Sequence, residues 1–447
     1  MTQPARALFR RLFSMTLRDL LFIGIPMLVL VAAGFWGAWQ FVRPAPPRHL
    51  VLATGSPEGA YHMHGARYRD ELAKEGVEVT LRPTAGSIDN LKRLNDPDSG
   101  VDAAFLQSGT ATLDDGSGLA ALGTLYPEPL WVFTRGRALD TLDALKGKRL
   151  AIGAEGSGTR KLALTLLESH GLQTGPSTLL PLGGLAAAAA LAKGEVDAVF
   201  AVGAMRSAAV WTLLYTPGAR LMHFSQAEAY ARRLPYLRVV TLPRGTIDLE
   251  RNLPERDIAL VAPTAQLVAR EDLHPALGDL LLQAAHEIHG DAEVFQKAGE
   301  FPNAKGTDIP LSREAERYYR NGKPFLQRYL PFWAATLIDR MIVLLVPIVA
   351  ILLPLIKIAP GIYAWRVRSR VFRYYGELKL LEYQAQQDPT AKTRQEWLAE
   401  LDRIEEAAHR LATPVAFAND VYTLREHVHM VRQTLLRRLE ETPVPLA

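Results

Sequence analysis

The chain has 447 residues, too many for one ordinary domain and enough for a large core with additional modules. Its composition, 48% hydrophobic and 22% charged, is that of a globular chain, and 51 basic residues against 47 acidic ones give no reason to expect a nucleic-acid partner. The absence of cysteine excludes disulfides and thiolate metal sites and is compatible with an oxidising compartment.

The first element in chain order is an uncharged apolar stretch, residues 20–42, which is long enough for a helix to cross a bilayer. Arginines precede it at Arg6, Arg10, Arg11 and Arg18, so the positive-inside rule places residues 1–19 in the cytoplasm and the chain after about residue 43 outside. A cleaved signal peptide is the alternative. The apolar run exceeds the usual 7–15 residues, roughly, of a signal peptide, and no clear cleavage site follows it, which favours an uncleaved anchor.

From residue 49 onward, strand-like and helical patterns alternate. Strands are expected at 49–56, 101–109, 129–136 and 196–203, with helices at 62–75 and 88–94 among them. Such alternation predicts an α/β fold with parallel sheets and crossover helices, and the length suits two sheets.

Four turns that follow these strands are rich in small polar residues: 54–57, 84–87, 107–110 and 156–160. In open α/β sheets, ligands bind beyond the carboxyl ends of the strands. Free amides at helix N-termini also favour anions there. The alternative is that each serine or threonine only caps its helix, so capping and binding both remain open.

The wording and order of these segments carry a family resemblance. TGSPEGAYHMHG, PTAGSIDNLKRL, VDAAFLQSG, LYPEPLWVFTRG, LKGKRLAIGAEGSGTRKLA and GEVDAVFAVG resemble the TAXI family of solute receptors of TRAP transporters over roughly residues 49–325. The resemblance implies a two-lobed, type II-like periplasmic binding protein within residues 43–335. Lobe 1 would comprise about 49–133 and 255–325, and lobe 2 about 134–250.

The family also implies a ligand and partners. The ligand would be a small anionic or zwitterionic solute such as a dicarboxylate, an oxo acid or a glutamate-like amino acid, and the partners would be TRAP membrane subunits. Carried over by motif, the expected ligand-binding residues are Ser56, Tyr61, Ser87, Asn90, Gln107, Ser108, Tyr126, Ser157, Gly158, Thr159 and Arg160. Arg160 would grip a carboxylate bidentately, or instead pair with Glu155 at the surface. The first loop departs from the family where Ala60 and His62 flank Tyr61.

No catalytic residue, metal site or cofactor is expected. Ser157 lacks the spacing of a nucleophile elbow, because Glu155 stands where that motif has its first glycine. The histidine pairs at 62/64 and 286/289 lack the spacing of H-E-x-x-H, and no third ligand is identifiable, so these side chains are expected to be solvated or in the core.

A second apolar span is expected at 338–363, followed by Arg366, Arg368, Arg370 and Arg373. The arginines predict a second crossing with both termini in the cytoplasm, the binding domain in the periplasm and the chain in a bacterial inner membrane. Pro347 and Pro354 would kink the span. The tail, 364–447, has helical patterns at 374–387, 392–412 and around 421–435, either packed on one another or presenting a coiled-coil face to a partner.

These features predict a membrane-anchored solute receptor that serves transport. The alternatives are a transmembrane sensor that couples solute binding to the helical tail, and a structural envelope protein.

Overall fold

The computed structural model describes residues 17–41, 44–112, 117–172, 176–411 and 413–441. The arginines at 6, 10 and 11, and the end of the predicted helix at residue 412, lie outside these ranges. The chain forms two compact units: Pro44–Leu337, and Met1–Arg43 together with Ile338–Ala447. We describe each by itself.

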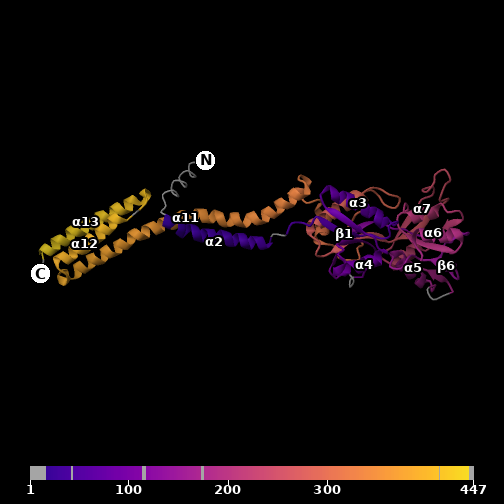
Figure 1. Ribbon diagram of the computed structural model, residues 1–447, viewed down its shortest axis with the longest axis horizontal. Helices are drawn as coiled ribbons and strands as arrows, with labels where there is room; N and C mark the ends of the chain where they lie inside the picture. The colour runs from indigo at the N-terminus through magenta and orange to yellow at the C-terminus, as the bar shows by residue number, and fades with distance from the viewer. Residues whose placement is uncertain (1–16, 42–43, 113–116, 173–175, 412, 442–447) are drawn as a thin grey trace. The chain divides into compact units, whose positions relative to one another are not determined.

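The unit Pro44–Leu337 contains two five-stranded sheets, each covered by helices (Figure 1). The first sheet has the order β2-β1-β3-β12-β4. Its strands are β1 (His49–Ala53), β2 (Glu78–Arg82), β3 (Ala103–Gln107), β4 (Leu119–Pro127) and β12 (Thr264–Arg270). We call this sheet and its helices the first lobe. The helices are α3 (Ala60–Lys74), α4 (Ser87–Asn95), α9 (Pro275–His289) and α10 (Arg313–Asn321).

The second lobe repeats the arrangement, with the order β7-β6-β8-β5-β9. Its strands are β5 (Leu130–Arg135), β6 (Arg149–Ala151), β7 (Thr178–Leu180), β8 (Ala198–Val202) and β9 (Ala219–Leu221). The helices are α5 (Gly158–Ser169), α6 (Gly184–Lys193), α7 (Ala208–Leu214) and α8 (Ala227–Arg233). A two-stranded antiparallel ribbon of β10 (Arg238–Leu242) and β11 (Ile258–Ala262) completes this lobe.

The α/β class is confirmed, but the sheets are mixed rather than purely parallel. In each sheet four strands run in the same direction. The strand adjoining the passage between lobes, β12 in the first and β5 in the second, is antiparallel to both its neighbours. The chain passes between lobes around residues 128–129 and 263, because β5 pairs in the second sheet and β11 packs on the second-lobe core. The second lobe therefore begins earlier and ends later than the sequence suggested.

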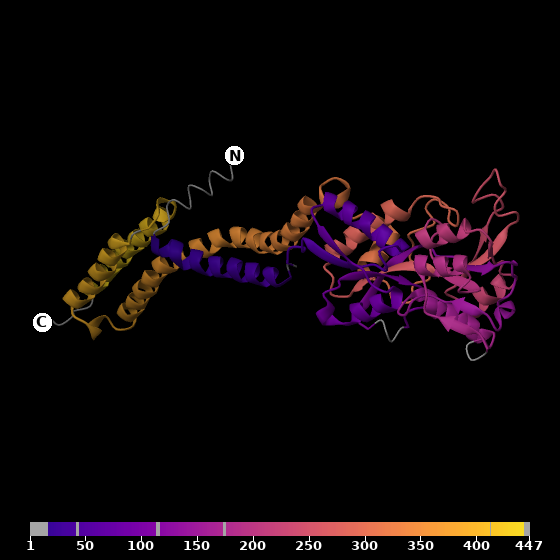
Figure 2. The same ribbon diagram turned by 45° about the vertical axis from the view of Figure 1, so that its right-hand side comes forward.

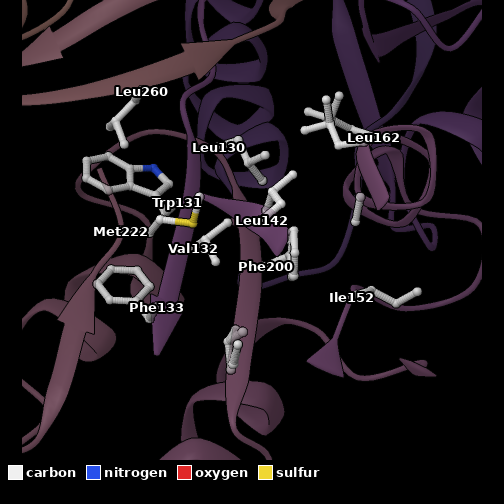
Figure 3. Close-up of a cluster of buried hydrophobic side chains, with 14 of the residues drawn as sticks. Leu130, Trp131, Val132, Phe133, Leu142, Ile152, Leu162, Phe200, Met222 and Leu260 are labelled. Atoms are coloured by element: carbon white, nitrogen blue, oxygen red, sulfur yellow. The ribbon is translucent and has the colours of Figure 1, made fainter. Parts of the chain in front are cut away.

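Each lobe has its own apolar core. In the second lobe, Trp131 and Phe133 on β5 pack with Phe200 on β8, and all three are at most 1% exposed (Figure 3). The indole Nε1 of Trp131 donates to the carbonyl of Gly203 at 2.9 Å, so the ring is buried without leaving a polar atom unpaired. In the first lobe α3 and α9 pack together against the sheet, with Leu72 and Leu281 at the centre of the cluster.

The other unit contains α2 (Leu17–Phe41) and most of α11 (Phe332–Gln387). Both helices are long and apolar enough to cross a membrane, and almost none of either apolar stretch is buried. They run antiparallel (Figures 1 and 2): Gly34 lies against Ile351, and Arg366 lies 3.6 Å from the ring centroid of Phe22. The helix α11 continues through both Pro347 and Pro354, so the structure shows no break there.

The tail packs internally. The last part of α11, α12 (Arg394–Arg410) and α13 (Ala418–Glu441) lie side by side (Figures 1 and 2). Trp397, Leu401, Leu424 and Val428 are at most 1% exposed in their shared core. The first helix predicted in the tail, 374–387, is the end of α11 rather than a separate element. This arrangement agrees with the module alternative, since the apolar faces are used within the chain.

Candidate functional site

A cavity of about 400 Å³ lies where the turns after the strands of both sheets meet. Its first-lobe wall comes from the loops that begin α3 and α4, from the end of β3, and from the segment after β4. Its second-lobe wall comes from the turns that begin α5, α6 and α7, with apolar residues of β8. A pocket at the carboxyl ends of strands is the expected place for a ligand in such a fold.

Seven of the predicted site residues line this cavity: Ser56, Tyr61, Ser87, Gln107, Ser157, Gly158 and Thr159. They come from segments far apart in the chain, which the two sheets bring to one place.

The first-lobe wall is built around a carboxyl group. The Tyr61 hydroxyl donates to Glu128 Oε2 at 2.7 Å, and Glu128 is 3% exposed. Burial raises the pKa of Glu128 to about 8 from its ordinary 4.5, and the hydrogen bond from Tyr61 opposes part of that rise. Beside this pair, the backbone amide of Gln107 donates to Ser87 Oγ at 2.9 Å, which fixes the Ser87 side chain.

The second-lobe wall is built from tight turns. Ser157 caps α5: its Oγ accepts from the amide of Arg160 at 3.2 Å and donates to the carbonyl of Ala154 at 2.6 Å. Because its one proton is already donated, the Ser157 hydroxyl offers a solute an acceptor and not a donor. Capping, one of the two readings of this turn, is therefore observed.

The lobes contact each other directly beside the cavity. The amides of Ile88 and Asp89, at the start of α4, donate to the carbonyl of Gly156 at 3.1 and 3.3 Å. Gln107 Nε2 donates to the carbonyl of Gly158 at 3.2 Å. A β-carbon on Gly158 would lie 2.7 Å from Gln107 Oε1, so this approach requires glycine. The start of α4 is thus capped by the opposite lobe, and these two amides are not free for an anion.

A second helix start lies close to a carboxylate of the opposite lobe. The carboxylate of Glu58, in the first lobe, lies close to Gly184, the first residue of α6, because a β-carbon there would be 3.9 Å from Glu58 Oε2. Glu58 and Glu128 are the charged side chains that line the cavity, and no lysine, arginine or histidine of the described residues does so.

Four predicted residues lie outside the cavity lining. Asn90 holds strands together, since its Nδ2 donates to the carbonyls of Thr54 and Phe105, and Ser108 accepts from the amide of Thr264 at 2.8 Å at the passage between lobes. Asn90 is therefore engaged within the first lobe, and Ser108 at the passage between the lobes. Tyr126 lies one layer behind the wall, and Arg160 is half-buried with Nη1 unpartnered among the described residues.

Behind the first-lobe wall lies a layer of four rings: His64 and Tyr68 from α3, Tyr126 from β4 and His289 from α9. The ring centroids of His64 and His289 are 4.7 Å apart, and Tyr126 stacks on His289 at 5.1 Å. Burial lowers the pKa of His64 to about 4 and that of His289 well below its ordinary 6.5. The sequence left these histidines as solvated or in the core, and did not predict that 64 and 289 would meet.

Sequence reasoning missed Glu128. A signal was present: Glu128 stands between Pro127 and Pro129, with apolar strands on both sides. A charged residue held between two prolines at the end of a buried strand has few conformations available to reach solvent.

Comparison with known proteins identifies the unit that carries this cavity. The model of the NMT1-like family matches residues 52–322, which is more than half of the chain. The chain belongs to the NMT1-like family. The NMT1-like region lies entirely within the unit Pro44–Leu337 and includes every residue that lines the cavity and both sheets, apart from the first three residues of β1.

Solved structures of solute-binding proteins are similar to part of the chain. They include the alkanesulfonate-binding protein SsuA from Xanthomonas axonopodis pv. citri bound to MOPS, at 20% identity over 55% of this chain and 74% of that one, with a TM-score of 0.36. The periplasmic aliphatic sulphonate binding protein SsuA from Escherichia coli is 18% identical over 55% of this chain and 69% of that one, with a TM-score of 0.35. A periplasmic binding protein from Salmonella typhimurium with high arginine specificity is 16% identical over 56% of this chain and 96% of that one, with a TM-score of 0.35. Such low values leave the solute of the NMT1-like region open.

Proposed function

We propose that the protein is a membrane-anchored receptor of the TAXI type, which binds a small carboxylate or amino acid in the periplasm and delivers it to TRAP membrane subunits. The observation that carries the proposal is the cavity between the two lobes, lined by seven residues whose motifs resemble that family. The two apolar helices, by length and composition, support an anchor in the inner membrane with both termini in the cytoplasm.

The experiment is a solute screen on the full chain in detergent micelles, read as the midpoint of thermal unfolding. A solute that binds only the folded state raises that midpoint by mass action. We expect one amino acid or carboxylate to raise it in a saturable way. A folded protein that responds to no member of a broad panel of carboxylates and amino acids would contradict the receptor function and favour a structural role in the envelope.

A second function, transmembrane sensing, is supported by one observation. The helix α11 begins in the binding unit, where Phe332 is 3% exposed and the indole of Trp333 donates to the carbonyl of Glu75, and it ends in the tail module. Sensing requires that solute change the state of the tail. Hydrogen exchange in α12 and α13, measured with and without the solute found above, distinguishes the two functions: altered exchange supports sensing, and unchanged exchange supports transport alone.

A further inference from the structure

The charge balance of the cavity is unusual for a site that takes an anion. Its charged lining residues are Glu58 and Glu128, and none of the described lining residues is basic. Glu128 is the buried one. Tyr61 donates to its Oε2, whereas no hydrogen bond from the described residues reaches its Oε1. Oε1 of this buried carboxyl group is thus left to accept a hydrogen bond from a solute in the cavity.

Among the described residues, no cationic side chain pairs with Glu128, and the charge of Arg67 acts on His64 and His289 in the layer behind. Tyr61 on α3, Tyr126 on β4 and Glu58 in the loop before α3 face this region, and the layer behind holds His64 and His289. Burial lowers the pKa of both histidines, so they are neutral at pH 7. A buried carboxylate needs a partner of opposite charge, and the described residues do not provide one here.

A second group in the cavity also offers only an acceptor. The Ser157 hydroxyl has donated its proton to the carbonyl of Ala154, so its free lone pair faces a solute as an acceptor. Acceptors on both walls favour a solute that carries hydrogen-bond donors.

We propose that Glu128 selects the solute by binding a protonated amine. The inference rests on the receptor function proposed above and narrows its solute to amines, of which amino acids are the members that also carry a carboxylate. The solute ammonium donates to Oε1 while Tyr61 holds Oε2, giving a charge-assisted hydrogen bond out of contact with water. Oxo acids and dicarboxylates that lack the amine leave this carboxyl group without a cation.

The proposal predicts a direction for the pH dependence of binding. An ammonium group requires ionised Glu128, whose pKa in the empty cavity is raised by burial to about 8. Binding therefore releases a proton below that pH, and affinity rises about tenfold from pH 6 to pH 7 and levels off above pH 8. A solute that accepts a hydrogen bond from protonated Glu128 has the opposite dependence: constant affinity below pH 8 and a loss above it.

The test compares solutes that differ only in the amine. Isothermal titration of the full chain in detergent micelles uses three pairs: alanine and pyruvate, glutamate and 2-oxoglutarate, and leucine and 4-methyl-2-oxopentanoate, at pH 6, 7 and 8. We expect binding of an amino acid whose affinity rises with pH, and none of its oxo partner. Binding of an oxo acid alone overturns the role of Glu128 and leaves the receptor function standing. A folded chain that binds none of the six overturns this inference, and the broader screen described above decides whether the receptor function falls with it.

Variants separate recognition from packing. Glu128→Gln keeps the size of the side chain and removes its charge, and we expect amine affinity to fall about 100-fold and its pH dependence to disappear. Tyr61→Phe removes a hydrogen bond that favours ionisation, so the rise in affinity should move to higher pH. The exposed Glu255, changed to Gln, is the matched control and should change neither. An unaltered pH profile in folded Glu128→Gln overturns the proposal.

Discussion

The two walls of the cavity use different chemistry. The first-lobe wall presents side chains that hold or exchange protons, with Tyr61 and Glu128 in direct contact and His64 and Tyr126 in the layer behind. The second-lobe wall presents turns of glycine, alanine, serine and threonine, together with the start of α5. The first-lobe wall thus carries the charge that we propose to select the solute, and the second-lobe wall contacts the first lobe directly.

The difference shows why two similar sheets contribute unequally. A wall of backbone groups accepts many solutes, because amides and carbonyls are present at every turn. A buried ionisable group accepts few, because it is stable only beside a complementary charge or when neutral. The first lobe should accordingly carry the pH dependence of the molecule, and the second lobe should carry its sensitivity to small changes in shape.

The largest expected effect belongs to Glu128. Burial raises its pKa to about 8 from 4.5, so its contribution to the free energy of unfolding is present below pH 4.5 and is lost as pH rises to 8. The loss amounts to about 5 kcal/mol. In Glu128→Gln, the thermal midpoint relative to wild type should therefore increase from pH 5 to pH 8. Tryptophan fluorescence during heating measures this, and parallel pH profiles for the two proteins would show that the carboxyl group is not the source.

The next effect has the opposite sign and lies in the layer behind the same wall. Burial lowers the pKa of His64 to about 4 from 6.5, so its contribution to stability is present above pH 6.5 and is lost as pH falls to 4. The loss is about 3 kcal/mol. In His64→Leu we expect a weaker loss of stability between pH 6.5 and 4, whatever the change at neutral pH. His49→Leu, at an exposed position, should retain the wild-type acid slope.

The contact between the lobes gives a smaller effect on binding. Gly158→Ala places a β-carbon 2.7 Å from Gln107 Oε1 and 3.1 Å from Ser87 Oγ, so Gln107 must move and lose its bond to the carbonyl of Gly158. We expect solute affinity to fall about tenfold, because one hydrogen bond between the lobes is lost. Gly278→Ala, in α9 with no atom nearer than 3.9 Å, is the control. Equal affinities in the two variants would show that the contact at Gly158 does not contribute.

The second-lobe wall was more predictable from the sequence than the first. The segment AEGSGT predicts a turn that leads into a helix. The preference for serine at helix N-caps places Ser157 at the N-cap, as observed. The turn at 84–87 was predicted equally well. The hydrogen bonds from the residues just after it to the carbonyl of Gly156 were not, because no local sequence pattern shows how closely two lobes approach. His64 and His289 meet from two distant helices, and Glu128 comes from a third segment in the wall before them. Burial, which decides the charge of all three, follows only from the packed fold.

The smallest effect decides between capping and binding at Ser157. Ser157 in the second lobe and Ser312 in the first both cap helices through Oγ, accepting from the amides of Arg160 and Ala315 at 3.2 and 3.0 Å. Replacing either by alanine should cost about 1 kcal/mol of stability. If Ser157 also accepts a hydrogen bond from the solute, Ser157→Ala alone should lower affinity, by about fivefold. Equal solute affinity in Ser157→Ala and Ser312→Ala would show that Ser157 only caps its helix. Recognition of the solute by side chains would then belong to the first-lobe wall.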